Sequence, residues 1–221
     1  MVINSFDILR FWLKFTPGTY YKFVALVRKK DHKDSDAKLP LKTEERGEIF
    51  IRQWFVDSFE ALEKYKDDMI GLCDVTGARL YMTVDRKSTT KTILAMQEQL
   101  AGYIKQLVSN PQAPISIRKL SKFSASASQL AECSDGQKYW LFDIDDKEHW
   151  YEISLIFSKL LLKEVSFVTP NGLHILAKRN FDAHKWLEEQ TKEGAPLYPF
   201  ASNISVKDNA LTLIYFNTGE N

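Results

Sequence analysis

Alternating and periodic apolar positions divide this chain into strands and helices. Runs rich in aromatic and β-branched residues predict strands at 20–27, 48–56, 78–84, 139–144, 165–168, 173–177 and 210–216. Apolar residues at helical spacing predict helices at 58–73, 88–108 and 147–162, and a short helix at 181–186. Ser58 and Ser88 stand where helix N-caps are expected, and Gly77 should end the first helix. The apolar side of the second helix is expected to contain Ile93, Leu94, Met96, Leu100, Ile104, Leu107 and Val108.

The order of these elements predicts an α+β protein. From 139 to 216 the order is β-α-β-β-α-β, which is typical of a ferredoxin-like or RRM-like (RNA-recognition-like) sheet. We expect an N-terminal α/β subdomain at 1–110, packed against an RRM-like subdomain at 138–221. The segment 111–137 shows no clear period and is predicted to be a linker or a functional loop. The charged stretch 29–46 is predicted to be a solvated connector or a long hairpin loop.

Charge and cysteine content limit the partners and the cellular compartment to be expected for the protein. With 30 basic and 29 acidic residues, no global field draws the chain to nucleic acid or membrane, so polyanion contacts must come from a local patch. The two cysteines form no CxxC pair, which favours a reducing compartment without disulfides or structural zinc. No apolar run approaches the roughly 20 residues that span a bilayer. We therefore expect a soluble, cytoplasmic protein with no membrane partner.

An acidic pair ends the predicted strand 139–144. Side chains alternate between the faces of a strand, so Asp143 and Asp145 should point to one side, and Phe142 and Ile144 to the other. Two carboxylates on one face repel each other unless a cation lies between them, and hard oxygen ligands suit Mg²⁺ or Mn²⁺. In the alternative interpretation, Asp145 and its neighbour Asp146 only cap the helix that follows.

A second candidate element is the turn at 169–174, with the sequence Thr-Pro-Asn-Gly-Leu-His. Backbone amides at Asn171 and Gly172 could approach an anion in such a tight turn. His174 begins the returning strand and could hydrogen-bond a phosphate, and Lys178 shares its side of that strand, with Arg179 following. The alternative is an ordinary hairpin with a surface histidine.

Together, these two motifs resemble the archaeo-eukaryotic primase (primase-polymerase) superfamily, including members encoded by phages and plasmids. Asp143-Ile144-Asp145 matches its hydrophobic-DhD strand, and 169–174 resembles its motif of a small residue, Gly and His; the resemblance covers about 139–216. It implies that the two aspartates bind the catalytic divalent metals, while His174 contacts the phosphates of the incoming nucleotide. It also implies a third acid near a later strand, for which Asp208 is the best match.

Asp182 competes with Asp208 for that third role, although a helix N-cap suits Asp182 better. A further basic edge after strand 78–84 comprises Arg79, Tyr81, Asp85, Arg86 and Lys87. That edge either faces nucleic acid or is a solvated strand end. The five tryptophans could stack bases, but they lie in apolar runs that favour core packing.

The leading hypothesis is a metal-dependent nucleotidyltransferase of the primase-polymerase type. It would use Mg²⁺ or Mn²⁺, a nucleoside triphosphate and single-stranded or primed nucleic acid, with a helicase or other replication protein as a possible partner. The first alternative is a non-catalytic nucleic-acid-binding accessory protein of DNA replication. The second is a metal-dependent phosphoesterase. The chain lacks GxGxxG, P-loop, GxSxG and HExxH motifs, which removes the usual nucleotide-fold, acyl-transfer and zinc-protease interpretations.

Overall fold

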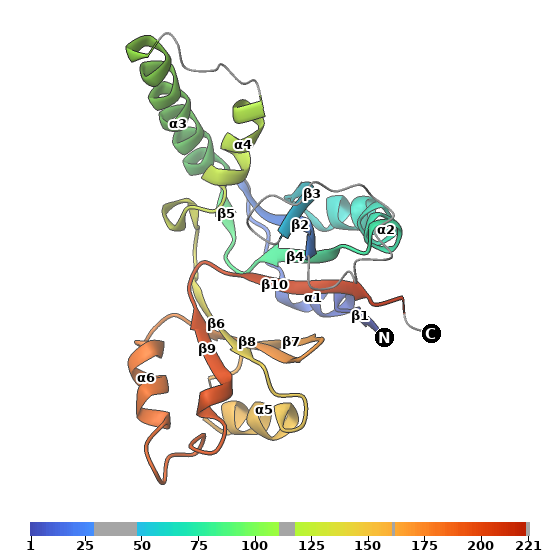
Figure 1. The fold of residues 1–221 in the computed structure, drawn as a ribbon, viewed down its shortest axis with the longest axis vertical. Helices are drawn as coiled ribbons and strands as arrows, with labels where there is room; N and C mark the ends of the chain where they lie inside the picture. The colour runs from blue at the N-terminus through green and yellow to red at the C-terminus, as the bar shows by residue number, and fades with distance from the viewer. Residues whose placement is uncertain (29–47, 111–117, 161, 220–221) are drawn as a thin grey trace.

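Two antiparallel sheets organise the protein (Figure 1). The structure is a computed structural model that describes residues 1–28, 48–110, 118–160 and 162–219. Helices and strands alternate along these residues, so the expected α+β class is confirmed. The predicted loop at 29–46 lies outside the described residues.

The larger sheet has the strand order β1-β10-β4-β2-β3, and β5 pairs with β2. Its strands and flanking helices are β1 (Val2–Asn4), α1 (Phe6–Trp12), β2 (Thr19–Arg28), β3 (Glu48–Val56), α2 (Phe59–Thr76), β4 (Arg79–Thr83), β5 (Lys87–Ser88) and β10 (Leu211–Asn217). Helix α2 buries Leu62, Met69 and Cys73 against the sheet, positions that share one face of a helix. Its N-cap Ser58 accepts a hydrogen bond from the Ala61 amide, as predicted.

The smaller sheet has the strand order β7-β8-β6-β9. Its elements are β6 (Tyr139–Ile144), α5 (Trp150–Lys159), β7 (Val165–Thr169), β8 (Gly172–Lys178), α6 (Ala183–Gln190) and β9 (Ile204–Lys207), with short 3-10 turns at Ala131–Cys133 and Ala201–Asn203. Helices α5 and α6 cover one face (Figure 1). Under them, Phe142 packs edge-on against Phe157 and Trp186. On the other face, Leu141 and Leu176 join the apolar core of the larger sheet. The two sheets therefore share a core.

The last strand differs from the prediction. The run at 210–216 was expected to complete the RRM-like sheet, but β10 pairs with β1 and β4 of the larger sheet. The strand beside β6 is instead β9, which the sequence prediction missed. Both results have one cause: alternation identifies a strand but not its sheet, and a four-residue strand gives a weak pattern.

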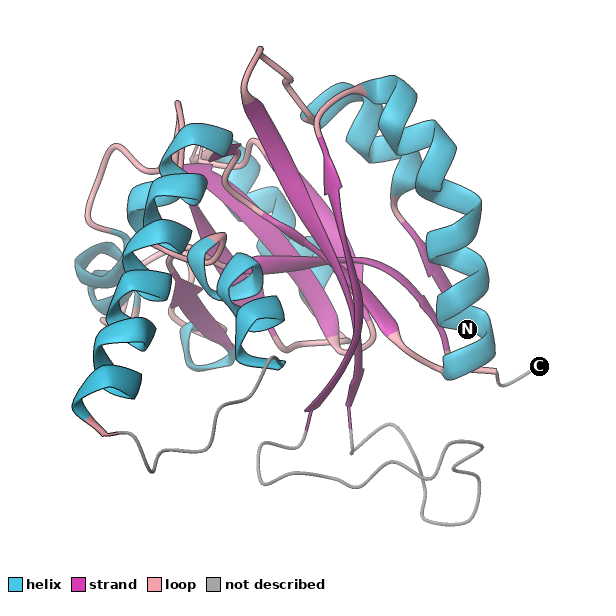
Figure 2. Ribbon diagram, turned by 90° about the horizontal axis from the view of Figure 1, so that it is seen from above, coloured by secondary structure: helices cyan, strands magenta, loops and turns pink. Residues whose placement is uncertain are grey.

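Helix α3 (Thr89–Ser109) and helix α4 (Arg118–Ala127) extend away from the sheets (Figures 1 and 2). The prediction of a linker at 111–137 is wrong for the part that forms α4, while 111–117 lie outside the described residues. The predicted apolar side of α3 is largely exposed, at Ile93, Leu94, Leu100, Ile104 and Val108. The buried positions of α3 are Thr92, Ala95 and Tyr103. Because α3 projects from the sheets, only a narrow side of it finds a packing partner.

Two lysines lie in the interior where the base of the α3–α4 projection meets the larger sheet. Lys22 of β2 is 1% exposed, and its Nζ donates a hydrogen bond to the Ala125 carbonyl of α4 at 3.1 Å. Lys87 is fully buried and donates to Ser134 and Asn209. Burial, with a smaller contribution from the charge of Lys87, lowers the pKa of Lys22 from 10.5 to about 8. The predicted solvated strand end is thus wrong for Lys87, and likewise for the buried Asp85.

Lys22 should make stability rise with pH. Between pH 8 and 10.5 the unfolded chain holds a proton on Lys22 that the folded chain has released, so the free energy of unfolding increases across this window. We expect the wild-type protein to gain about 3 kcal/mol relative to Lys22→Met between pH 7 and 10. Urea denaturation of both proteins at several pH values measures the difference in the free energy of unfolding. The contributions of all other titrating groups cancel in this difference. Parallel stability curves would contradict the lowered pKa.

Candidate active site

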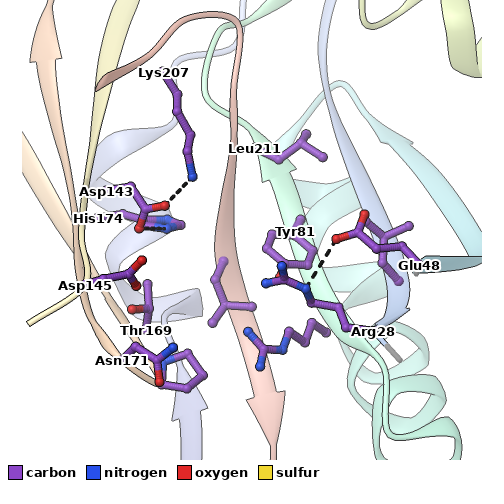
Figure 3. Close-up of a pocket in the computed structure, with 14 residues that line it drawn as sticks. Arg28, Glu48, Tyr81, Asp143, Asp145, Thr169, Asn171, His174, Lys207 and Leu211 are labelled. Carbon is purple, nitrogen blue, oxygen red and sulfur yellow. Dashed lines mark hydrogen bonds and ion pairs between the residues drawn. The ribbon is translucent and has the colours of Figure 1, made fainter. Parts of the chain in front are cut away.

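A cleft of about 360 Å³ opens between the two sheets (Figure 3). The smaller sheet contributes the side chains of Asp143, Asp145, Thr169, Pro170, Asn171, His174 and Lys207. The larger sheet contributes Leu26, Arg28, Glu48, Arg79, Tyr81, Leu211 and Leu213. The two motifs singled out in the sequence therefore meet in one cavity, although their key residues lie about 30 positions apart in the chain.

Strand alternation places the acidic pair in this cleft. Phe142 and Ile144 are fully buried under α5 and α6, so Asp143 and Asp145 face the opposite side, as predicted. Asp146 holds the turn before α5, because its Oδ1 accepts hydrogen bonds from the amides of Glu148 and His149 at 3.0 and 2.8 Å; the N-cap of the helix is His149. The backbone amide of Asp145 donates to the Asn203 carbonyl at 3.0 Å, but its exposed carboxylate has no hydrogen-bond or ion-pair partner among the residues that the structure describes. Its carboxylate is therefore open to a ligand.

Asp143 has two cationic or polar neighbours. Its Oδ1 lies 3.3 Å from His174 Nε2, and its Oδ2 accepts a hydrogen bond from the Lys207 ammonium. The other ring nitrogen of His174, Nδ1, lies 3.1 Å from the hydroxyl of Thr212, a buried residue of the larger sheet. Burial alone would raise the pKa of Asp143, but the hydrogen bonds and charges of His174 and Lys207 outweigh it, and the pKa lies well below its usual value. Asp143 is therefore a stable carboxylate at neutral pH.

The turn between β7 and β8 sits directly against the end of β6. A Cβ atom added to Gly172 would lie 2.1 Å from the carbonyl oxygen of Ile144 and 3.0 Å from the amide nitrogen of Asp146. Only glycine allows this approach, which brings Thr169 and Asn171 to the same cleft as the acidic pair. The sequence pattern identified the turn, but the reason for its glycine is contact with β6.

Three predicted site residues are not brought to the cleft. Lys178 forms an ion pair with Glu164 at 3.0 Å, on the edge of the smaller sheet. Arg179 and Asp208 pair with each other at 3.0 Å and line a separate surface hollow. The third acid proposed from the resemblance therefore lies apart from Asp143 and Asp145. Asp182, the competing acid, caps α6 by accepting from two backbone amides, as expected.

The opposite wall of the cleft carries basic residues that the strand motifs did not reveal. Arg28 ends β2 and forms an ion pair with Glu48 of β3 at 3.3 Å. Arg79 of β4 lies in the same wall, with its guanidinium 4.5 Å from the ring centre of Phe216. Arg79 and Tyr81, which belong to the basic edge expected either to face nucleic acid or to be a solvated strand end, both line the cleft. Arg28 was missed because only the sheet pairing brings it near the acidic motif.

The donor atoms of the cleft meet some of the needs of a divalent metal ion. Asp143 and Asp145 offer hard oxygen ligands on one side of the cleft, which suits Mg²⁺ or Mn²⁺. Within the described ranges, no group of three or more His, Cys, Asp or Glu side chains is placed to hold a metal. Any divalent ion held by this pair would need substrate or water oxygens to complete its coordination. The Lys207 ammonium already neutralises one of the two carboxylates.

No family model, curated protein or solved structure matches the chain. Within the described residues, no helix is both long enough and apolar enough to cross a membrane.

Proposed function

We propose that the protein is a metal-dependent nucleotidyltransferase of the primase-polymerase type, acting on nucleic acid with a nucleoside triphosphate as donor. The observation that supports this most is the meeting of Asp143, Asp145 and His174 in one cleft. The register of β6 and β8 brings them together, because Asp143 pairs directly with His174 and Asp145 follows on the same face. Arg28 and Arg79 on the facing wall are the basic side chains that could meet a polyphosphate, and Arg28 would have to exchange Glu48 for it.

We infer in addition that the smaller sheet is RRM-like, that is, ferredoxin-like. Support comes from its β-α-β-β-α-β order along the chain and from the spatial order β7-β8-β6-β9 with every neighbouring pair antiparallel. Both helices cover one face, and the acidic pair stands on the other. In this arrangement the smaller sheet holds the acids, and the larger sheet supplies the second wall.

In the proposed reaction, Asp143 and Asp145 would hold the divalent ion. When bound, such an ion aligns a primer 3′-oxygen and neutralises the charge that develops on the transferred phosphate. The basic side chains of the larger sheet would orient the triphosphate across the cleft. A nucleic-acid strand would then enter from the open side, where Asp145 is exposed.

The experiment is a test of primer synthesis and primer extension by the purified protein, with Mg²⁺ or Mn²⁺ and single-stranded or primed templates of DNA and RNA. The expected result is incorporation of nucleotide that a chelator abolishes. Lack of incorporation across templates and both metals would overturn the proposal. Release of phosphate without chain extension would instead indicate a phosphoesterase.

One observation favours a second candidate, a non-catalytic nucleic-acid-binding protein of the replication machinery. The Lys207 ammonium already forms an ion pair with the Asp143 carboxylate, and Asp208 lies outside the cleft. A site that has lost metal chemistry could keep its basic wall and bind phosphates directly. This candidate predicts nucleic-acid binding that a chelator does not change. The logarithm of its binding constant should fall linearly with the logarithm of the salt concentration.

His174 provides a test of how the site handles phosphate. We expect His174→Ala to raise the apparent KM for the nucleotide about tenfold while Mn²⁺ binding persists, because in the proposal His174 Nε2 turns from Asp143 to a phosphate oxygen when nucleotide binds, and Asp145 remains. Steady-state primer extension and direct Mn²⁺ titration measure the two effects. Thr212→Val is the matched control, since it removes only the hydroxyl that faces His174 Nδ1. If His174→Ala and Thr212→Val change thermal stability alone, His174 is a structural link between the sheets.

A further inference from the structure

Lys207 is the last residue of β9, and its side chain reaches along the sheet to the carboxylate of Asp143 (Figure 3). In the β6–β9 ladder Leu141 pairs with Lys207, and Asp143 pairs with Ser205. Lys207 and Asp143 are therefore diagonal neighbours on one face, a separation that a long side chain can span. The contact follows from the register of the two strands.

The two partners of this ion pair differ in their freedom to move. The Asp143 side chain is 15% exposed and is also held by His174, whereas the Lys207 side chain is 50% exposed. Among the described residues, the Lys207 ammonium has no second hydrogen-bond or ion-pair partner, and the neighbouring Asp208 is paired with Arg179. The ammonium can leave Asp143 by rotation of its flexible stem, without disturbing the core.

We propose that Lys207 is a tethered cation that competes with a divalent metal ion for Asp143 and thereby sets the metal affinity of the cleft. This inference rests on the proposed function to the extent that Asp143 and Asp145 are the metal-holding pair. A metal ion and an ammonium at the same carboxylate repel each other, so the ion binds only when the ammonium is displaced. Asp145 has no such competitor and provides the first ligand.

Displacement gives the ammonium a second role. A released Lys207 remains at the edge of the cleft, where it faces any phosphate that enters with the metal. The side chain therefore exchanges one anion for another. Lys207 is a positioning residue in this scheme: it determines when the metal is held, and it takes no part in bond formation.

The test compares the Mn²⁺ affinity of the 221-residue wild-type chain with that of two lysine variants. Binding is followed by the electron paramagnetic resonance signal of the free ion. Lys207→Gln should bind Mn²⁺ about tenfold more tightly than wild type, because one competing charge at a partly exposed carboxylate is removed. Lys185→Gln is the matched control: it makes the same change in net charge on α6, which covers the other face of the smaller sheet. Its affinity should equal that of wild type.

A second measurement follows the metal ion on the wild-type chain and uses the variant only to assign one signal. Lysines are methylated reductively with ¹³C-formaldehyde, and the signal missing from Lys207→Gln identifies Lys207. The expected result is a shift of that signal as Mg²⁺ is added. The shift should be half complete at the Mg²⁺ concentration that half-fills the site. An unchanged Lys207 signal at saturating Mg²⁺ would overturn the proposal.

The outcomes separate this inference from the proposed function. Tighter Mn²⁺ binding by Lys207→Gln, in a protein that transfers no nucleotide, supports the tethered cation and rejects the transferase. Equal Mn²⁺ affinity in Lys207→Gln and in an active wild type supports the transferase and overturns the tethered cation. Absence of Mn²⁺ binding in both proteins overturns the inference and the metal-dependent function together.

Discussion

Asp145→Asn should reduce nucleotidyl transfer roughly a thousandfold while leaving the fold intact. The side chain is exposed and has no partner among the described residues, so its replacement should change the free energy of unfolding by less than about 0.5 kcal/mol. The amide keeps the size of the carboxylate but removes the charge that holds a divalent ion. Primer extension and urea denaturation of the same preparation measure the two quantities.

Asp146→Asn is the control for this prediction. It lies one residue further along, on the other side of the chain, and caps the approach to α5 with an oxygen that asparagine also provides. Transfer by Asp146→Asn should therefore match wild type. An equal loss in both variants would mean that the charge of this loop matters, and that the position of Asp145 in the cleft does not. Asp143 is less suitable for the test because its replacement also leaves His174 and Lys207 without their carboxylate partner.

Much of the fold follows from local pattern. The strand at 48–56 and the strand at 139–144 begin and end at the predicted residues, because their apolar and aromatic runs are bounded by charged or polar residues. Ser58 and Ser88 cap α2 and α3, and Gly77 ends α2 with a left-handed φ of 65°. These features depend on neighbours in sequence, which a single chain displays directly.

What the sequence could not reveal depends on pairing between distant strands. Nothing local indicates that β10 joins the larger sheet, or that α3 projects with its leucines and isoleucines exposed. The same limit applies to the cleft. Alternation located Asp143 and Asp145, but Arg28 and Glu48 reach the cleft only because β2 and β3 stand across from the smaller sheet.

The third predicted acid, Asp208, misses the cleft by one position in the chain. Asp208 was selected from the resemblance because it precedes an apolar strand, but β9 ends at Lys207. Lys207 shares the face of Asp143, so the next residue, Asp208, turns away and pairs with Arg179. The pattern Ile-Ser-Val-Lys at 204–207 does alternate, and a strand assigned there would have pointed to Lys207. A four-residue run is too short to be distinguished from a loop on that basis alone.

Gly172→Ala should destabilise the protein by about 3 kcal/mol, because the added methyl group meets backbone atoms that cannot rotate away. The new Cβ would lie 2.1 Å from the Ile144 carbonyl oxygen, so either the start of β8 or the end of β6 must move. Asp145 lies between Ile144 and Asp146, the two residues that the methyl group contacts, and should lose its position in the cleft. We therefore expect nucleotidyl transfer to fall with stability, and to stay low at temperatures where the variant is folded.

Gly102→Ala separates this contact from the general effect of replacing glycine. Gly102 lies within α3, and a Cβ added there has no atom within 4 Å. Alanine favours a helix interior over glycine, so Gly102→Ala should raise the free energy of unfolding by about 0.5 to 1 kcal/mol. Urea denaturation of the three proteins, followed by circular dichroism, gives both differences, which should have opposite signs. A Gly172→Ala protein as stable as wild type would contradict the close approach of the turn to β6, and with it the explanation of how the turn and the acidic pair come to share one cleft.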